Sequence, residues 1–377
     1  MTAYERTIGR VAGARPGPTL VAVAGMHGNE PGGVLAARRV LAALAGREAL
    51  VRGELVAFTG NLGALRTGRR FVAKDFNRVW TRERVERLRR DPDAACVDAE
   101  DFEQRELLAE LDRAVENARG EVYAVDLHTT SAAGTPFVIF GDTLRQRGFV
   151  LALPVPAILG LEELIDGVLA QHLTERGCVT FSVEGGQHDD PASVDNLEAC
   201  LWLALESSGV LARNAVPELA RSRALLDARR GRVPRVMEVL RRHAITPEDA
   251  FVMEPGFRNL HPVGAGQLLA SDRRGKIRAP ADGVVMLPLY QAQGADGFFW
   301  GRAVDGARIA ASEVLRALGA DRWLGRLPGV RRHRGEREGF EVDTRVARLY
   351  PLQVFHLFGY RRVRHVGDVL TVTRQPD

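Results

Sequence analysis

The fold is decided by the stretch Leu20-Val21-Ala22-Val23-Ala24-Gly25-Met26-His27-Gly28-Asn29-Glu30. Its apolar part predicts a buried strand that ends at Gly25, where the chain turns. His27 and Glu30 follow in that turn, at the carboxyl end of the strand, where open α/β sheets place their binding sites. An imidazole and a carboxylate so close in sequence can face one divalent ion, and zinc accepts both kinds of ligand. A histidine near a glutamate is also common on ordinary protein surfaces.

Two further apolar strands bring polar side chains to their ends in the same way. Residues 122–130 deliver His128, and residues 178–186 deliver Glu184 just before a double glycine. If these strands and the first one are parallel neighbours, the side chains converge on one edge of the sheet. Two histidines and one glutamate leave the fourth tetrahedral position of zinc open to water, as in catalytic sites. Glu184 also fits a helix-capping or ion-paired carboxylate.

The stretch Asn61 to Trp80 has little periodicity and is rich in glycine and arginine, so we expect an irregular loop. It contains Arg70 and the neighbouring pair Asn77 and Arg78. An arginine fork matches a carboxylate bidentately, and an adjacent amide can complete the clamp. Asp75 offers an alternative, in which Arg–Asp pairs hold the loop together. The residues alone leave both interpretations open.

Taken together, these motifs resemble those of the succinylglutamate desuccinylase/aspartoacylase family, relatives of the zinc carboxypeptidases. The resemblance spans about residues 18–210 and extends more loosely to about residue 300. It rests on Gly25-Met26-His27-Gly28-Asn29-Glu30, Asp75-Phe76-Asn77-Arg78, Asp126-Leu127-His128-Thr129 and Glu184-Gly185-Gly186, in this order. It implies an α/β fold with a mixed, mostly parallel sheet flanked by helices, as in zinc carboxypeptidases. A smaller β-rich C-terminal domain would follow.

The resemblance also implies a role for each residue of the site. One zinc ion per chain would be held by His27, Glu30 and His128. Glu184 would be the general base, and Arg70 would contact the scissile carbonyl.

The carboxylate of the substrate would be bound by Asn77 and Arg78. We therefore expect a zinc-dependent amidohydrolase that cleaves the amide bond of a small N-acyl amino acid or a related acylamide. Two alternatives stay open. The first is a zinc carboxypeptidase that acts on peptide C-termini, and the second is a basic binding protein whose metal site is only structural.

Other residues near the motifs have no settled role. His188 fits a fourth ligand, a substrate contact or an ordinary loop histidine. Arg176 and Tyr290 are the nearest matches to a substrate arginine and a C-terminal tyrosine of the family, but neither aligns with it. Asp126 lies on the same strand face as His128, so a hydrogen bond between them is geometrically feasible. The acyl group and the amine product are therefore left open.

We place the catalytic domain at residues 1–210, a linker at 211–230 and the C-terminal domain at 231–377, because the alternation of strands and helices ends near residue 209. Leu35 and Phe102 are expected among the core contacts of their helices. Helices are predicted over residues 31–45, 98–117, 160–173, 195–207 and 307–318. Further strands are predicted over residues 54–59, 136–140, 250–253, 267–270, 276–280, 283–287, 349–358 and 369–372. Residues 151–159, which contain two prolines, should form a short edge element.

The composition is that of a globular protein. The chain has 377 residues, of which 45% are hydrophobic and 27% charged. No apolar run approaches the length needed to cross a membrane, and the N-terminus lacks the apolar core of a signal peptide. Cys96, Cys178 and Cys200 form no CxxC pair, which argues against a disulfide framework. We therefore predict a cytoplasmic protein with a small-molecule substrate and no membrane partner.

The net charge of +4 is too small to indicate a nucleic-acid partner, because 48 acidic residues are interspersed with the 52 basic ones. The densest basic stretches are residues 331–334 and 361–364, and their function is left open. Residues 325–339 should form a mobile loop. The oligomeric state, including a homo-oligomer, is not determined by the sequence.

Overall fold

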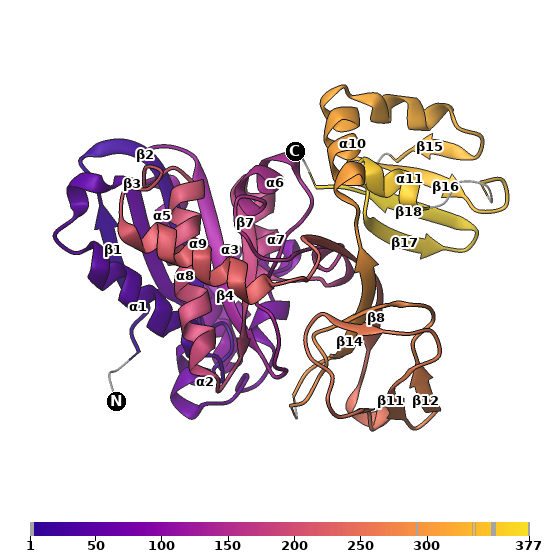
Figure 1. Ribbon diagram of the computed structural model, residues 1–377, viewed down its shortest axis with the longest axis horizontal. Coiled ribbons are helices and arrows are strands. Elements are labelled where there is room, and N and C mark those ends of the chain that lie inside the picture. The colour runs from indigo at the N-terminus through magenta and orange to yellow at the C-terminus, as the bar shows by residue number, and fades with distance from the viewer. Residues whose placement is uncertain (1–3, 292, 334, 336, 348–351, 376–377) are drawn as a thin grey trace.

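The computed structural model describes residues 4–291, 293–333, 335, 337–347 and 352–375 (Figure 1). A mixed sheet of 11 strands runs through it. In spatial order these are β1 (Thr7–Ala12), β3 (Arg52–Thr59), β2 (Arg15–Ala24), β4 (Val122–Thr130), β7 (Val179–Gln187), β5 (Phe137–Ile139), β6 (Ala157–Leu159), β8 (Val236–Ala244), β14 (Asp296–Ala303), β13 (Gly283–Met286) and β10 (His261–Val263). From β3 to β8 the strands pair in parallel, except that β5 is antiparallel to β7. The expected mixed α/β sheet flanked by helices is confirmed.

Helices cover both faces of this sheet, so successive residues of its central strands enter opposite cores. Along β2, Leu20, Ala22 and Ala24 join one core, whereas Val21 and Val23 join the other. The first core is covered by α1 (Gly32–Leu44), α6 (Leu144–Val150), α8 (Pro191–Ser207) and α9 (Pro217–Arg230). The second is covered by α3 (Arg82–Arg90), α4 (Pro92–Ala95), α5 (Ala99–Glu116) and α7 (Leu169–Glu175).

The C-terminal part of the chain extends the same sheet and then builds a separate lobe. Strands β8, β14, β13 and β10 pair in antiparallel fashion. Beside them lies a three-stranded sheet of β9 (Val252–Met253), β11 (Leu268–Asp272) and β12 (Gly275–Arg278). The last lobe, at the upper right of Figure 1, contains α10 (Gly306–Ala317), α11 (Leu352–Leu357), β15 (Val330–Arg332), β16 (Gly339–Asp343), β18 (Val369–Thr373) and β17 (Arg362–Val366). The expected β-rich C-terminal domain is confirmed, and its exact limits stay a prediction.

A buried ion-pair network fixes the last lobe to the sheet. Asp142, which follows β5, is fully enclosed, and its Oδ2 lies 2.5 Å from Nε of Arg361 in the last lobe. Its Oδ1 lies 2.6 Å from a guanidinium nitrogen of Arg147 on α6. Burial alone would raise the pKa of Asp142, but these arginines hold it below its usual range. Removing one partner of such a pair would leave a buried charge uncompensated.

Several local predictions for the catalytic part are wrong. The expected loop over residues 61–80 contains α2 (Leu62–Thr67) and the 3₁₀ helix η2 (Phe76–Arg78). Helix α2 is a short helix that the Asn61 side chain caps at its start and Gly68, with φ +64°, at its end, so it is too short to show a period. The expected helix over 160–173 is divided into η3 (Glu162–Leu164) and α7, because Gly167 adopts φ +75° between them.

Three predictions about position in the core are also wrong. Leu35 and Phe102 are 45% and 44% exposed, so neither is a core contact. Strand β6 lies inside the sheet between β5 and β8 and is not an edge element. Its outer neighbour, β8, comes from the C-terminal part of the chain, so no local sequence pattern could have revealed this pairing.

Other differences concern the C-terminal part. Within the expected linker, Pro217–Arg230 form α9, and its Leu219 and Leu226 are buried in the first core. The predicted strand over 349–358 is wrong where it is described, because Leu352–Leu357 form α11, and residues 349–351 lie outside the described residues. Strand β15 lies within the expected loop over 325–339. Across the described residues, no helix is long and apolar enough to traverse a bilayer.

Candidate metal and active site

The loop after β2 presents His27 and Glu30 on one side. Gly25 turns the chain with φ +69°, a conformation that favours glycine. The backbone amide of Glu30 donates to the carbonyl of His27 at 3.2 Å, which closes the turn. The amide of Gly28 donates to the carbonyl of Arg70 at 3.1 Å. This last bond ties the loop to the segment that carries the other predicted site residues.

Strands β4 and β7 bring the remaining two groups beside this loop. His128 and Glu184 are direct cross-strand partners, and Asp126 pairs with Ser182 earlier along the same two strands. Direct partners on neighbouring strands point to the same face of a sheet. Because β2, β4 and β7 are parallel neighbours, as predicted, their carboxyl ends gather His27, His128 and Glu184 at one edge.

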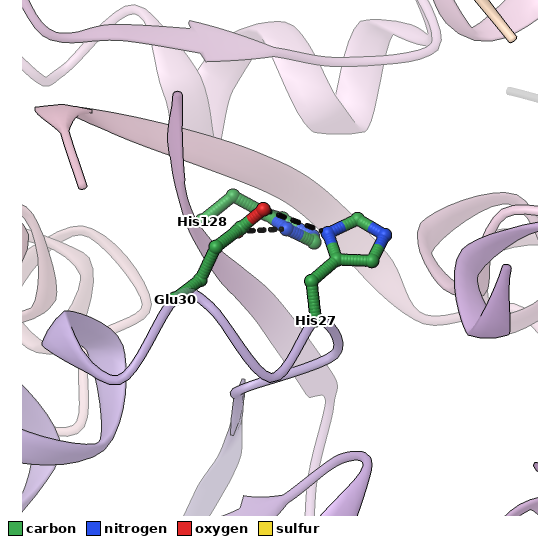
Figure 2. Close-up of side chains that lie close together, drawn as sticks. All are labelled: His27, Glu30 and His128. Carbon is green, nitrogen blue, oxygen red and sulfur yellow. Dashed lines mark hydrogen bonds and ion pairs between the residues drawn. The ribbon is translucent and has the colours of Figure 1, made fainter. Parts of the chain in front are cut away.

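The two histidines point at one carboxylate, as Figure 2 shows. Nδ1 of His27 lies 2.8 Å from Oε1 of Glu30, and Nδ1 of His128 lies 3.0 Å from Oε2 of the same residue. All three residues are buried, and their ligand atoms lie within 4.8 Å of one another. The three residues predicted as metal ligands are therefore gathered into a group that could hold one metal ion.

Each histidine has a second carboxylate on its other ring nitrogen. Oδ1 of Asp75 lies 3.1 Å from Nε2 of His27, and Oδ2 of Asp126 lies 2.8 Å from Nε2 of His128. As the acceptor at Nε2 of His27, Asp75 holds the proton there, so the lone pair of Nδ1 of His27 is free for a metal. Nε2 of His128 faces both the Asp126 carboxylate and the NH₂ group of Asn77, which lies 3.3 Å away. The donor set therefore fits a metal ion in its chemistry as well as in its spacing. The sequence indicated Asp126 for this role, but it offered Asp75 only as a partner for arginine.

The charges within this group are strongly coupled. Burial would raise the pKa of Glu30, yet the nearby His27 and His128 hold it well below its usual range. Burial would likewise lower the pKa of His128, but Asp126 and Glu30 raise it well above its usual value. The site thus concentrates carboxylates around two imidazoles, an arrangement that favours a cation at its centre.

Glu184 stands apart from this hydrogen-bonded group. Its Oε2 is buried without a hydrogen-bond partner among the described residues. Burial raises the pKa of Glu184 to about 8, against the opposing charge of His128, and Glu30 adds to the rise. A carboxyl group with a free oxygen and a pKa in this range can both accept and return a proton near neutral pH.

The three predicted substrate contacts reach the same cleft from the segment before α3. The guanidinium of Arg70 binds Oδ2 of Asp75 at 3.1 Å and lies 3.6 Å from Oε1 of Glu30. The amide of Leu169 donates to Oδ1 of Asn77 at 2.9 Å, which turns the NH₂ group of Asn77 towards His128. The Arg–Asp pair weighed as an alternative is thus present, and Arg70 still lines the cleft.

Arg78 also lines the cleft, but it has a partner that the sequence did not indicate. Its guanidinium donates to Oδ2 of Asp296, on β14, at 3.0 Å. Asp296 also binds Nε of Arg242 at 2.5 Å. The C-terminal part of the chain therefore orients Arg78, and a substrate carboxylate would share that arginine with Asp296.

The cleft is open to solvent and has a volume of about 130 Å³. His188 lines it, and its Nδ1 lies 2.7 Å from Oγ1 of Thr129, outside the three-ligand group. Arg176 pairs with Asp112 and does not line the cleft. The hydroxyl of Tyr290 donates to the carbonyl of Glu254 at 2.7 Å, so it too points elsewhere.

The fold and the site define an α/β protein with a candidate His–Glu–His metal group at the carboxyl edge of three parallel strands. Residues 16–184 match the family model for the succinylglutamate desuccinylase/aspartoacylase catalytic domain. The resemblance indicated by the four sequence motifs is therefore confirmed. No curated protein sequence gives a significant match to this chain.

Solved structures of similar fold include three proteins of this kind. The succinylglutamate desuccinylase from Chromobacterium violaceum shares 16% identity at a TM-score of 0.52, over 77% of this chain and 87% of that one. The succinylglutamate desuccinylase/aspartoacylase from Rhodobacter sphaeroides shares 16% identity at a TM-score of 0.56, over 78% of this chain and 88% of that one. The product-bound ectoine utilization protein from Ruegeria pomeroyi shares 21% identity at a TM-score of 0.53, over 77% of this chain and 86% of that one. At these identities the likeness shows a common fold.

Proposed function

We propose that this protein is a zinc-dependent amidohydrolase that removes the acyl group from small N-acyl amino acids. The observation that carries this proposal is the register of β4 with β7, which sets Glu184 directly beside His128. A carboxyl group whose Oε2 is buried thereby stands next to the group that could hold a metal, where it would act as the general base. The match of residues 16–184 to a deacylase family agrees with it.

Zinc, one ion per chain, is the metal that we propose for this group. Two imidazoles and one carboxylate suit zinc better than magnesium, which prefers an all-oxygen octahedral set. His27, Glu30 and His128 would hold it, and Asp75 would keep His27 in the ligating tautomer, while the charge of Asp126 lies beside Nε2 of His128. When bound, zinc supplies a Lewis acid that acidifies water and polarises a carbonyl.

The residues of the chain would divide the remaining work. Glu184 would take a proton from the attacking water on its free Oε2 and pass it to the nitrogen of the leaving amine. Arg70 would donate to the oxygen on which negative charge develops, an interaction often worth about 3 kcal/mol. Asn77 and Arg78 would bind the carboxylate of the substrate through an amide and a charged fork.

The substitution Gly28→Ala tests the first loop of this site. An added Cβ would lie 2.1 Å from the backbone carbonyl of Ala64, so the loop with His27 and Glu30 must shift. We expect zinc affinity to fall by about 10- to 100-fold, as for other changes that displace a ligand indirectly. Competition with a chromogenic chelator would measure it. Gly148→Ala, where nothing lies within 4 Å of the new atom, is the matched control and should bind zinc normally.

The main alternative, a zinc carboxypeptidase, differs from the proposed deacylase in the size of its substrate. Residues of the C-terminal part line the cleft, among them Leu287, Leu289 and Gln291 before β14 and Phe299 on it. A peptidase needs room for an extended chain on the acyl side, and these residues narrow that room.

We therefore expect an N-acyl amino acid to be cleaved with a kcat/KM at least about 100-fold higher than a tetrapeptide that ends in the same residue. The C-terminal amide of the N-acyl amino acid should bind poorly, because it offers no charge to Asn77 and Arg78. Steady-state kinetics on the three compounds would decide the matter. Equal or faster cleavage of the tetrapeptide would favour the carboxypeptidase.

A further inference from the structure

The positive charge of the chain is concentrated in its last lobe. Residues 304–377 contain 14 arginines and nine acidic residues, whereas the whole chain has a net charge of only +4. The part of the chain that precedes them is therefore close to neutral. The lobe projects from the sheet at one corner of the molecule, where a large partner can reach it (Figure 1).

Part of this charge lies beside exposed apolar side chains. Val314 on α10 and Leu318 at its end are four residues apart, so they lie on one helix face, and they are 58% and 66% exposed. Gly319, with φ +60°, leads the chain from α10 into the 3₁₀ helix η5 (Ala320–Arg326). Trp323, on η5, is 52% exposed. Three large apolar side chains therefore face solvent within ten residues.

The arginines around Trp323 have no acidic partner. The guanidinium carbon of Arg326 lies 3.9 Å from the centre of the larger Trp323 ring system, and that of Arg322 lies 5.9 Å from it. Arg332, on β15, reaches the same helix, because its Cγ lies beside Gly325 of η5. None of these three arginines forms an ion pair with a described residue.

The same stretch offers no outward-facing carboxylate. Across residues 314–332 the only acidic residue is Asp321. It is buried, it accepts a hydrogen bond from the hydroxyl of Tyr360 at 2.9 Å, and Arg374 lies 3.2 Å away. The charge of Asp321 is thus neutralised inside the lobe, and it does not compensate the exposed arginines.

These exposed residues form one surface, which we call the lobe patch: Val314, Leu318, Arg322, Trp323, Arg326 and Arg332. A nucleic acid would pair with its arginines but would offer little to its aliphatic side chains. A second copy of the chain, packed about a two-fold axis, would cover the aliphatic side chains but would bring arginines against arginines. An anionic lipid surface satisfies both, because its phosphates bind guanidinium groups and its interface accepts aliphatic side chains and tryptophan.

We propose that the lobe patch docks the protein on an anionic lipid membrane. Val314, Leu318 and Trp323 would enter the head-group region, and the three arginines would bind lipid phosphates. The sequence predicted no membrane partner because it has no long apolar run, but this surface is assembled from α10, η5 and β15 and needs no such run. The inference goes beyond the deacylase function and does not depend on it.

The first test measures binding of the full chain to lipid vesicles by sedimentation. At about 50 mM salt, vesicles of phosphatidylcholine with about 30% phosphatidylglycerol should bind the protein at least about 10-fold more tightly than phosphatidylcholine alone. Raising the salt to about 500 mM should release most of the protein, because exposed charges are then screened. Absence of binding to the anionic vesicles at low salt would overturn the proposal.

A charge-matched pair of variants locates the binding surface. Arg322→Gln combined with Arg326→Gln should weaken vesicle binding by about 10- to 30-fold, the contribution expected of two arginines near an anionic surface. The control combines Arg221→Gln with Arg229→Gln, which removes the same charge from exposed positions of α9 and should leave binding near the native value. Equal losses in both variants would show that only net charge matters, and would contradict the patch.

Tryptophan fluorescence tests insertion in the native protein, whether or not a variant folds. Of the four tryptophans, Trp80, Trp202 and Trp300 are buried, so Trp323 alone is exposed. Anionic vesicles should shift its emission to shorter wavelength, and brominated lipids should quench it. Trp323→Phe should lose both changes. Vesicle binding without quenching would contradict insertion of the patch.

Two further results would replace the membrane by another partner. A single-stranded oligonucleotide that binds more tightly than the anionic vesicles, and loses affinity in the Arg322/Arg326 variant, would assign the patch to nucleic acid. A dimer in sedimentation equilibrium that Leu318→Asp dissociates, together with no vesicle binding, would assign it to a second copy. Either result would overturn the proposal, and neither measurement depends on zinc or on turnover.

Discussion

Replacing Glu184 by glutamine is expected to lower kcat for an N-acyl amino acid by about 10²- to 10⁴-fold, the usual contribution of a general base. The amide has nearly the same shape but cannot take up a proton at neutral pH. Glu184 is outside the three-ligand group, so zinc content should stay at the native level. Kinetics and metal analysis on the same preparation would measure both quantities.

The control for this variant is Glu163→Gln, because it removes a carboxyl group that lies outside the cleft. Its kcat should stay near the native value. Near-normal turnover by Glu184→Gln would show that another group accepts the proton. The first candidate would then be His188, which lines the same cleft.

Replacing His128 by alanine should remove zinc and activity together. Only two ligands, His27 and Glu30, would remain. A zinc site needs at least three ligands from the protein. We expect the zinc content after dialysis to fall from about one per chain to close to none. Atomic absorption or mass spectrometry under native conditions would measure it.

Two companion variants make this test specific. Asp126→Asn keeps all three ligands but weakens the partner of Nε2, so zinc affinity should fall by only about 10- to 100-fold. His188→Ala should retain its zinc, because His188 lies outside the ligand group. Full zinc occupancy in His128→Ala would remove His128 from the proposed site.

The centre of the fold and the four groups that meet there could be predicted from local patterns in the sequence. Apolar runs that end in His27, His128 and Glu184 predicted three strands, and parallel strands bring their carboxyl ends to one edge. The helices α1, α5, α8 and α10 also lie where the spacing of apolar residues predicted them, with ends that differ by at most about four residues. These features depend on local patterns, and so the sequence contains them.

The remaining contacts of the site became visible only in the folded structure, because they depend on which distant segments meet. Asp75 reaches His27 from 48 residues away in the chain, and Arg78 binds Asp296 from 218 residues away. Strand β6, from the catalytic part, pairs with β8, which follows α9. A local pattern fixes the conformation of a segment, but pairings between distant segments depend on the packing of the whole chain, so these neighbours could not be derived from one sequence.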